Sequence, residues 1–252
     1  MKKRIYLLLE IILVIVFLGS GYKIAMYLYQ DNLQKDKFAQ LSEQIETNKS
    51  ANRLVSTDNG EKIISKYANL YDENKDFIGW IKIKGTKINY PVMKTDSDFQ
   101  YYLYKNFEKE KSIYGTPFIG ENCEINPNSD NIIIYGHNMK NGTMFSDLNK
   151  YKDYEFYKKH AQVEFDTIYD EGKYKIAYAF VTEVNKKEEF DYYNYTNLSE
   201  DNIYNDFTEN LEKVKLYDTG IKIEKGDSVI TLSTCEKRSN NSRMVVVAKR
   251  VK

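Results

Sequence analysis

The stretch Ser228-Val-Ile-Thr-Leu-Ser-Thr-Cys235 is an apolar run rich in β-branched residues, and it ends on a cysteine. A short polar loop follows, and a second β-rich run then opens with Arg243. The pattern predicts two strands, with the thiol at the end of one and the guanidinium at the start of the next. A thiol held beside a fixed positive group is placed to act as a nucleophile. The stretch therefore indicates acyl transfer through Cys235.

A nucleophilic thiol needs a partner, because its pKa in model peptides is about 8.5 and the thiolate is the reactive form. The chain has two histidines to supply one. His137 follows the apolar run Ile132-Ile-Ile-Tyr-Gly, where the glycine predicts a turn at a strand end. His160 lies among charged residues in a helix-like segment. We therefore expect His137 to be the base.

Length and composition limit the class of protein. The chain has 252 residues, of which 42% are hydrophobic, so it can form one sizeable domain with appendages. Its 37 basic residues balance 37 acidic residues. Because nucleic-acid binding normally leaves a basic excess, no nucleic-acid partner is expected.

The N-terminus predicts a membrane anchor. Lys2-Lys-Arg4 precedes an apolar segment, residues 5–25, that is interrupted mainly by Glu10 and Lys23. A bilayer-spanning helix needs about twenty apolar residues, and the basic cluster favours a cytoplasmic N-terminus with the rest outside the cell. A cleaved signal peptide is the alternative, but no small-x-small cleavage site follows the run. We assign residues 1–29 to a cytoplasmic tip and anchor.

The two cysteines, Cys123 and Cys235, have two readings. In an oxidising compartment they could form one disulfide. However, Cys123 lies in a polar loop, whereas Cys235 ends an apolar strand, which favours unequal roles. The cysteines and histidines lack the paired short spacing of zinc ligands, so neither a metal nor another cofactor is expected.

Residues 30–75 form a predicted helical segment. Apolar residues recur there at intervals of three and four, first over 33–45 and again over 63–71. Polar residues and Gly60 separate the two patterns. The patterns predict two short helices that pack on the following domain. A solvated stalk that lifts the domain from the membrane is the alternative.

From residue 76 to 252 the period changes to that of β-strands. Many short strands separated by turn residues predict a barrel or sandwich that carries the chemistry. A helix is expected to begin at Ser199, a residue type that caps helices, and to lie between two late strands. The predicted strand regions are 77–92, which holds two strands around a Gly-Thr turn, 131–135, 163–168, 174–184, 221–223, 228–233 and 244–251.

Four ordered motifs resemble the class B sortases. They are Gly79-Trp80-Ile, Tyr135-Gly-His137-Asn, Thr231-Leu-Ser-Thr-Cys235 and Arg243-Met-Val-Val-Val. The resemblance covers roughly residues 70–252. It implies a mainly β fold, an eight-stranded β-barrel with an N-terminal helical pair and a helix inserted before the cysteine-bearing strand. It also implies a membrane-anchored cysteine transpeptidase of a Gram-positive bacterium.

The resemblance assigns three catalytic residues. Cys235 would attack a peptide carbonyl that follows a threonine and form a thioacyl enzyme. His137 would protonate the departing amine and deprotonate the incoming one. Arg243 would donate hydrogen bonds to the substrate or the oxyanion, with the backbone N–H of Glu236 as a second donor. Arg238 is an alternative to Arg243, which the resemblance favours because it opens the final strand.

Further residues are predicted near the substrate. Ser233 lies two positions before Cys235 and so on the same strand face, where its hydroxyl would reach a substrate or bond within the barrel. Glu236 follows the cysteine. Leu103 is expected to line the substrate groove or pack in the core, as are Trp80 and Tyr90.

The resemblance also implies the partners. They are secreted proteins with a C-terminal sorting signal, of an Asn-Pro or Ser-Pro type, a peptidoglycan precursor or other amine, and the membrane. Two other classes stay open. A surface cysteine hydrolase would pass the acyl group to water, although the papain-type sequence Cys-Gly-Ser-Cys-Trp is absent. A noncatalytic binding domain would keep Cys235 as a structural thiol.

Overall fold

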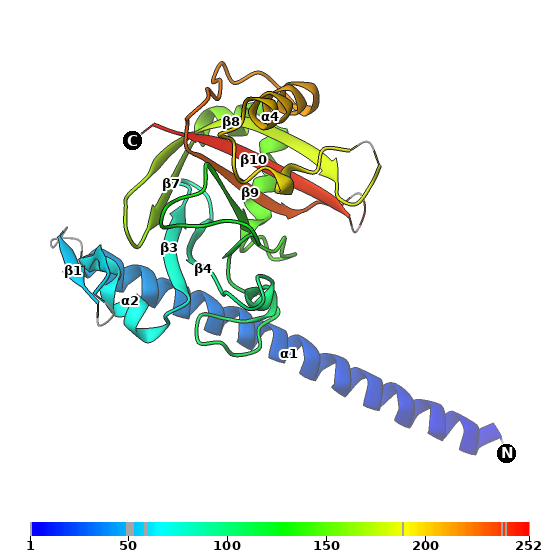
Figure 1. Cartoon of the computed structure of the whole chain (residues 1–252). Helices are drawn as coiled ribbons and strands as arrows, with labels where there is room; N and C mark the ends of the chain where they lie inside the picture. The colour runs from blue at the N-terminus through cyan, green and yellow to red at the C-terminus, as the bar shows by residue number, and fades with distance from the viewer. Residues whose placement is uncertain are drawn as a thin grey trace. The chain divides into compact units, whose positions relative to one another are not determined.

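Figure 1 shows a computed structural model of the chain. It describes residues 2–48, 53–57, 60–187, 189–237, 239 and 241–251. Two compact units are distinguished, Met1–Gln40 and Leu41–Lys252. The first unit is the greater part of helix α1 (Lys2–Asn48), and the second holds all the strands.

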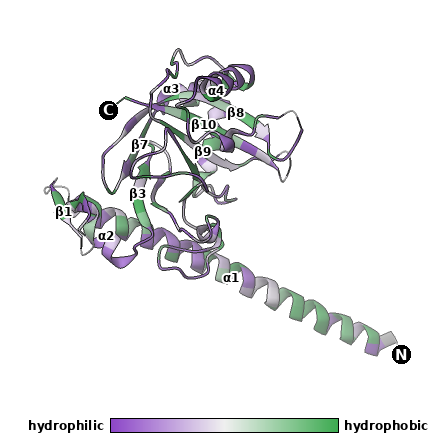
Figure 2. Ribbon diagram, viewed as in Figure 1, coloured by the Kyte–Doolittle hydropathy of each residue, from purple (hydrophilic) through white to green (hydrophobic). Residues whose placement is uncertain are grey.

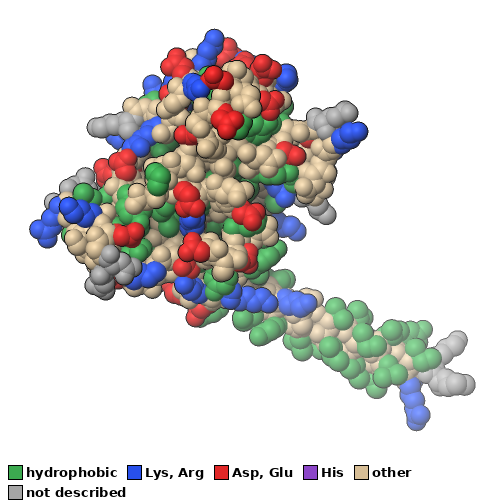
Figure 3. Space-filling model, in the orientation of Figure 1, with side chains coloured by type: hydrophobic (Ala, Val, Ile, Leu, Met, Phe, Trp, Pro, Cys, Tyr) green, Lys and Arg blue, Asp and Glu red, His purple; other side chains and the backbone are tan. Residues whose placement is uncertain are grey.

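The apolar part of α1 is long and hydrophobic enough to cross a membrane. Its most apolar window has a mean hydropathy of 2.2, and none of that window is buried within the protein. Large apolar side chains project from it on all sides; Phe17, for example, is 76% exposed. Figures 2 and 3 show apolar residues along the visible face of this segment. A helix that is apolar all round matches a lipid environment, in agreement with the predicted anchor.

The second unit is built on a closed barrel of eight strands, in the order β10-β8-β7-β3-β4-β5-β6-β9. Most neighbours are antiparallel, but β4 pairs with β5, and β6 pairs with β9, in parallel. The strands are β3 (Phe77–Lys82), β4 (Asn89–Met93), β5 (Phe118–Ile119), β6 (Asn131–Tyr135), β7 (Gln162–Thr167), β8 (Lys173–Glu183), β9 (Val229–Cys235) and β10 (Ser242–Arg250). The predicted mainly β, eight-stranded barrel is confirmed.

The core explains why the cysteine-bearing run becomes a strand. Six of the seven residues of β9 are buried, and only its last residue, Cys235, is exposed. Pairing with β6 on one side and β10 on the other provides backbone partners for this interior run. Continuous burial requires the β-branched and apolar residues seen in the sequence. The strand ends where its side chains reach solvent.

Two details of the predicted strands are wrong. Residues 221–223 are not a strand; instead the carbonyl of Ile223 accepts a hydrogen bond from the Tyr204 hydroxyl of the neighbouring helix. Strand β5 was not predicted, because two residues are too few for a periodic pattern.

Helix α4 (Asp201–Val214) lies between β8 and β9 in the chain, as predicted. Its N-cap is Glu200 rather than Ser199, and no side chain caps the helix. The Ser199 hydroxyl donates to the side chain of Asn197 at 2.5 Å instead. The short helices that follow β3 in the chain are η2 (Tyr101–Tyr104), η3 (Phe145–Lys152), α3 (Tyr154–Lys159) and η4 (Tyr192–Asn194).

The segment before the barrel differs in detail from two simple helices. The second apolar pattern begins as a strand, because Ile63 and Ile64 lie on β2 (Lys62–Ile64), which pairs with β1 (Leu54–Ser56). It becomes helical only in η1 (Ser65–Tyr67) and α2 (Ala68–Glu73). Figure 1 shows this group beside β3. Its buried residues in this stretch include Ile63, Tyr67 and Leu70.

Candidate active site

Three adjacent strands bring the predicted catalytic residues to one edge of the barrel. Arg243 on β10 is the direct cross-strand partner of Cys235 on β9. On the other side of β9, parallel strand β6 aligns Tyr135 with Ser233, and His137 follows two residues later. The threonine hydroxyl of Thr234 donates to the Gly136 carbonyl at 2.7 Å, which ties the two strand ends together. The topology thus gathers His137, Cys235 and Arg243.

Cys235 presents an exposed thiol on a fixed backbone. Its carbonyl accepts hydrogen bonds from the side-chain amides of Asn138, at 2.9 Å, and Asn149, at 3.3 Å. Asn138 directly follows the predicted base, and Asn149 lies on η3. Both segments therefore anchor the residue that carries the thiol.

His137 is held by the turn of η2. Its Nε2 lies 2.7 Å from the backbone carbonyl of Leu103, which can only accept a hydrogen bond, so Nε2 carries the proton. The neutral ring is left with Nδ1 to accept a proton. Burial lowers the pKa of His137, and the bond to Leu103 partly opposes that effect. The ring also lies 5.7 Å from that of Tyr104, centroid to centroid.

Arg243 is half-buried at the start of β10. Its Nη1 donates to the Ser242 carbonyl at 3.1 Å, which bends the guanidinium back along the strand. Its positive charge opposes the effect of burial on Tyr192, whose pKa is raised to about 12. The alternative arginine, Arg238, lies outside the described residues.

Ser233 is buried rather than presented to solvent. It is 1% exposed, and its hydroxyl lies 2.6 Å from the hydroxyl of Tyr192 on η4. Of the two roles predicted for Ser233, the structure therefore shows the hydrogen bond within the protein. In this position Ser233 orients Tyr192.

Glu236 does not offer the backbone donor that was predicted. Its N–H already donates to the Ser242 carbonyl at 2.8 Å, so it is not available to an oxyanion in this state. Its carboxylate accepts from the Ser242 hydroxyl at 3.0 Å and pairs with Lys152. The residue therefore fixes the loop after Cys235.

Leu103, Trp80 and Tyr90 lie on three different elements, η2, β3 and β4. Leu103 is half-exposed on η2, and its carbonyl is the partner of His137. Trp80 is 6% exposed and donates its indole N–H to Asn89 at 2.8 Å. Tyr90 is equally buried, and its hydroxyl accepts from the backbone of Met144. Trp80 and Tyr90 are packing residues, as expected.

The other thiol and the other histidine have structural surroundings. Cys123 and Cys235 are both free. Cys123 is 1% exposed, and burial raises the pKa of its thiol to about 11. His160 caps α3, with Nδ1 2.9 Å from the Phe156 carbonyl. Within the described ranges, no group of three or more His, Cys, Asp or Glu side chains could hold a metal ion.

Sequence reasoning missed four contributors to this site. They are the carbonyl of Leu103, the amides of Asn138 and Asn149, and the hydroxyl of Tyr192. A backbone carbonyl leaves no residue-type signal. The position of Asn138 beside His137 was the available clue, whereas Asn149 and Tyr192 reach the site only through the barrel's long-range pairings.

Comparison with known proteins agrees with this arrangement. A sequence model of the sortase domain family matches residues 81–251. Sortase B of Staphylococcus aureus (strain NCTC 8325 / PS 47) is 32% identical over 254 residues, which cover 99% of this chain and 98% of the relative. Sortase B of Listeria monocytogenes serovar 1/2a is 33% identical over 245 residues, which cover 96% and 95%.

Solved structures of sortase B are similar over most of this chain. A Staphylococcus aureus sortase B–substrate complex has a TM-score of 0.76 and 29% identity, and the match covers 89% of this chain and 99% of that one. Bacillus anthracis sortase B in complex with AAEK1 has a TM-score of 0.74 and 27% identity, with the same coverage. Staphylococcus aureus sortase B complexed with MTSET has a TM-score of 0.75 and 28% identity, and the match covers 88% of this chain and 90% of that one.

Proposed function

The chain belongs to the sortase family, a family of cysteine transpeptidases, and we propose that it cleaves a C-terminal sorting signal and transfers the protein to an amine. The observation that carries the proposal is the convergence of Cys235, His137 and Arg243 at the ends of β9, β6 and β10. An exposed nucleophile beside a base and a guanidinium is the arrangement that acyl transfer requires.

The first half-reaction forms a thioacyl enzyme. The sulfur of Cys235 bonds to the carbonyl carbon of the scissile peptide, and the tetrahedral intermediate collapses with loss of the C–N bond. The departing amine takes a proton from the imidazolium of His137. The Arg243 guanidinium donates hydrogen bonds to the substrate or to the oxyanion. The thiol proton is thereby returned to the leaving group through His137.

The second half-reaction releases the acyl group to an amine. The incoming amine attacks the thioester, His137 accepts its proton, and the C–S bond breaks. The result is a new amide bond and a regenerated thiol. Asn138 and Asn149 hold the backbone of Cys235 through both steps, because they bond to its carbonyl rather than to its sulfur.

The site faces the outer side of a cell membrane in this proposal. The apolar helix supports an N-terminal anchor, and the basic residues before it favour a cytoplasmic N-terminus. The partners are then secreted proteins with a sorting signal of the Asn-Pro or Ser-Pro type, and a peptidoglycan precursor or another surface amine. Both curated relatives carry the name sortase B, which supports this choice.

The test is a library of candidate pentapeptides incubated with the full chain, with and without an amine acceptor. The proposal predicts cleavage of a narrow set of sequences and an amine-linked product. Cys235→Ala abolishes both, His137→Ala nearly does, and Cys123→Ala leaves most activity, because catalytic groups fail together whereas a buried structural thiol does not take part. Cleavage that yields only the acid with every acceptor tried would favour the alternative, a surface cysteine hydrolase.

A further inference from the structure

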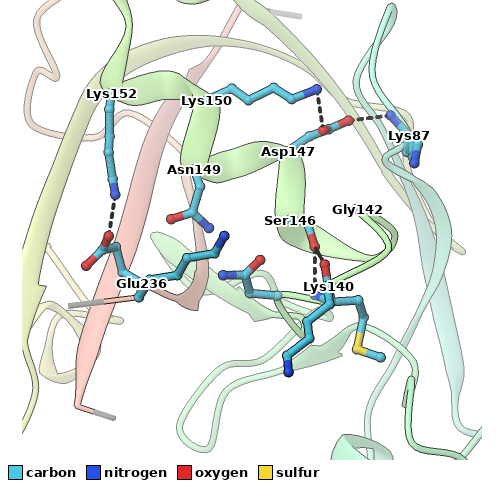
Figure 4. Close-up of a pocket in the computed structure, with 12 residues that line it drawn as sticks. Lys87, Lys140, Gly142, Ser146, Asp147, Asn149, Lys150, Lys152 and Glu236 are labelled. Carbon is cyan, nitrogen blue, oxygen red and sulfur yellow. Dashed lines mark hydrogen bonds and ion pairs between the residues drawn. The ribbon is translucent and has the colours of Figure 1, made fainter. Parts of the chain in front are cut away.

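A basic pocket of about 620 Å³ lies next to the candidate active site (Figure 4). Its lining includes Asn138 and Glu236, the residues that directly follow His137 and Cys235. Asn149, the second amide on the Cys235 carbonyl, also lines it. The pocket therefore adjoins the site, because its lining includes the chain neighbours of His137 and Cys235 and both amides that bond to the Cys235 carbonyl.

The charge of the lining is strongly positive. The lining holds two carboxylates, Asp147 and Glu236, and five lysines: Lys87, Lys140, Lys150, Lys152 and Lys237. Both acids are already engaged: Asp147 accepts from Lys150 at 2.8 Å, and Glu236 pairs with Lys152. Figure 4 shows these contacts. Among the residues that the structure describes, Lys87, Lys140 and Lys237 have no ion-pair partner. The Lys87 ammonium donates a hydrogen bond to the Asn141 carbonyl at 3.1 Å, so the charge available to a ligand is concentrated on Lys140 and Lys237.

One side of the pocket is a hydrogen-bonded turn, residues 139–146. The Ser146 hydroxyl accepts from the Met139 N–H at 2.7 Å, and its single proton is shared between the carbonyls of Thr143, at 2.6 Å, and Met139, at 2.9 Å. Gly142 has φ +76°, the left-handed conformation that glycine adopts without strain. Asp147, 3% exposed, also accepts from the backbone of Lys87 at 2.8 Å and joins the turn to the β3–β4 connection. The pocket therefore needs no rearrangement to form.

A positive pocket at this place is suited to the second substrate. The attacking amine must reach the thioester at Cys235 in its neutral form, and nearby lysines disfavour its protonated form. The same lysines attract an anion. A molecule with an amine at one end and an oxyanion several bonds away satisfies both conditions.

We propose that this pocket binds an anionic group, a phosphate or a carboxylate, carried by the amine acceptor. Lys140 and Lys237 contact the anion, and Lys87 adds to the field. The inference rests on the proposed transpeptidase function and names the chemical class of its second substrate.

Binding can be tested without turnover. Met139 lines the pocket, whereas Met93 and Met144 are buried in the core, so methyl-labelled methionine gives a reporter and two internal controls. The full chain in detergent micelles is titrated with inorganic pyrophosphate, triglycine and triglycine amide. The Met139 methyl signal, assigned with Met139→Leu, is expected to shift with pyrophosphate or triglycine and to respond much less to the amide. If neither anion binds better than the amide, the inference is overturned, whether or not peptides are cleaved.

Variants locate the anion. Lys140→Gln with Lys237→Gln is expected to weaken anion binding roughly tenfold, because two charge-assisted contacts are lost from a partly solvated site. Lys159→Gln with Lys173→Gln is the matched control, since both lysines are exposed and neither lines the pocket. Equal weakening by the two pairs would mean that the anion binds through overall charge, and would overturn the assignment.

Transfer separates the two sources of the anion. Acyl transfer to Gly-Gly-phosphoserine amide, triglycine and triglycine amide is compared at equal amine concentration. A lower KM for the phosphate-bearing acceptor means that the pocket binds a phosphate. A lower KM for triglycine alone means that it binds a carboxylate. In either case the difference in KM is expected to disappear in the Lys140→Gln/Lys237→Gln variant. Equal KM values for the three acceptors contradict the inference but leave the proposed function intact. Absence of peptide cleavage in the wild type contradicts the proposed function instead.

Discussion

At the level of single residues, Arg243 and Cys235 face each other across the β9–β10 ladder. Directly opposed residues on an antiparallel pair have Cβ atoms about 5 Å apart, close enough for one substrate group to touch both. The chain offers a matched comparison on the same strand. Arg250, at the other end of β10, is bound to Asp170 at 2.6 Å.

Arg243→Lys is expected to reduce kcat/KM by roughly 100- to 1000-fold, the usual effect of losing one transition-state donor. A point charge on a flexible stem does not replace a planar fork, although the net charge is kept. Arg250→Lys and Arg238→Lys are the controls and should change turnover little. Steady-state peptide cleavage measures all three. Near-native rates in Arg243→Lys, with loss in Arg238→Lys, would transfer the role to Arg238.

The two thiols are expected to differ in reactivity. Burial raises the pKa of Cys123 to about 11, so at pH 7.5 its thiolate fraction is below about one in a thousand. Cys235 is exposed. Iodoacetamide at pH 7.5 should therefore add one group, at Cys235, and modification of Cys123 should rise only as the pH approaches 11 or the protein unfolds. Peptide mapping after alkylation decides it, and early labelling of Cys123 would show that the thiol is not shielded.

At the level of elements, the sequence predicted the strands that carry the site and missed what supports them. The apolar run at 131–135 coincides with β6 because its buried positions are continuous. The strand predicted at 228–233 is confirmed within β9 for the same reason. The predicted strand at 221–223 is wrong, and the Ile223 carbonyl there bonds to the Tyr204 hydroxyl of α4 instead of to a neighbouring strand. Ser199 does not cap α4, because its hydroxyl bonds to the nearby Asn197 side chain. The carbonyl of Leu103 had no signal at all. Local pattern thus specifies strands, and tertiary pairing specifies the contacts that hold the site residues in place.

The link between β6 and η3 yields a prediction about Gly136. A Cβ at this position would lie 2.6 Å from the ring of Phe145, which is fully buried. Gly136→Ala is therefore expected to displace the next residue, His137, and to destabilise the fold by about 1–3 kcal/mol. Turnover should fall even at temperatures well below the Tm, where the variant is still folded.

The matched control is a smaller partner. Phe145→Leu makes room for the new methyl group, so the Gly136→Ala/Phe145→Leu pair should recover part of the turnover lost in Gly136→Ala. Phe145→Leu alone is the second single variant that the double-mutant cycle needs. If the pair is no more active than Gly136→Ala alone, the clash does not act through His137.

At the level of the whole molecule, the segment before the barrel is joined to it by more than apolar contact. Lys66 is 4% exposed and pairs with Asp166 of β7 at 2.9 Å, and the hydroxyl of Tyr67 donates to the same carboxylate at 2.7 Å. Desolvation and the neighbouring Asp166 raise the pKa of Tyr67, so it remains a donor at any working pH. Removal of this segment would leave Asp166 without these partners.

Two truncations test this division of labour. A chain that starts at residue 35 loses the apolar part of α1 but keeps the rest of that helix, and is expected to be soluble, folded and able to cleave peptide. A chain that starts at residue 76 also loses Lys66 and Tyr67, and its Tm should be lower by more than roughly 5 °C, since several buried side chains are lost. Thermal melts and cleavage below the Tm measure both. An unchanged Tm with lost cleavage would assign the segment to the substrate site.

The central claim is that Cys235 carries the acyl group during transfer. The direct measurement is intact-mass and peptide-mapping mass spectrometry of the full chain, quenched in acid during turnover of a cleaved peptide without an amine acceptor. The predicted result is a single thioester adduct, located on Cys235, that disappears on addition of the amine as the transfer product appears. An adduct on another residue, or amine-linked product formed by Cys235→Ala, would contradict the account.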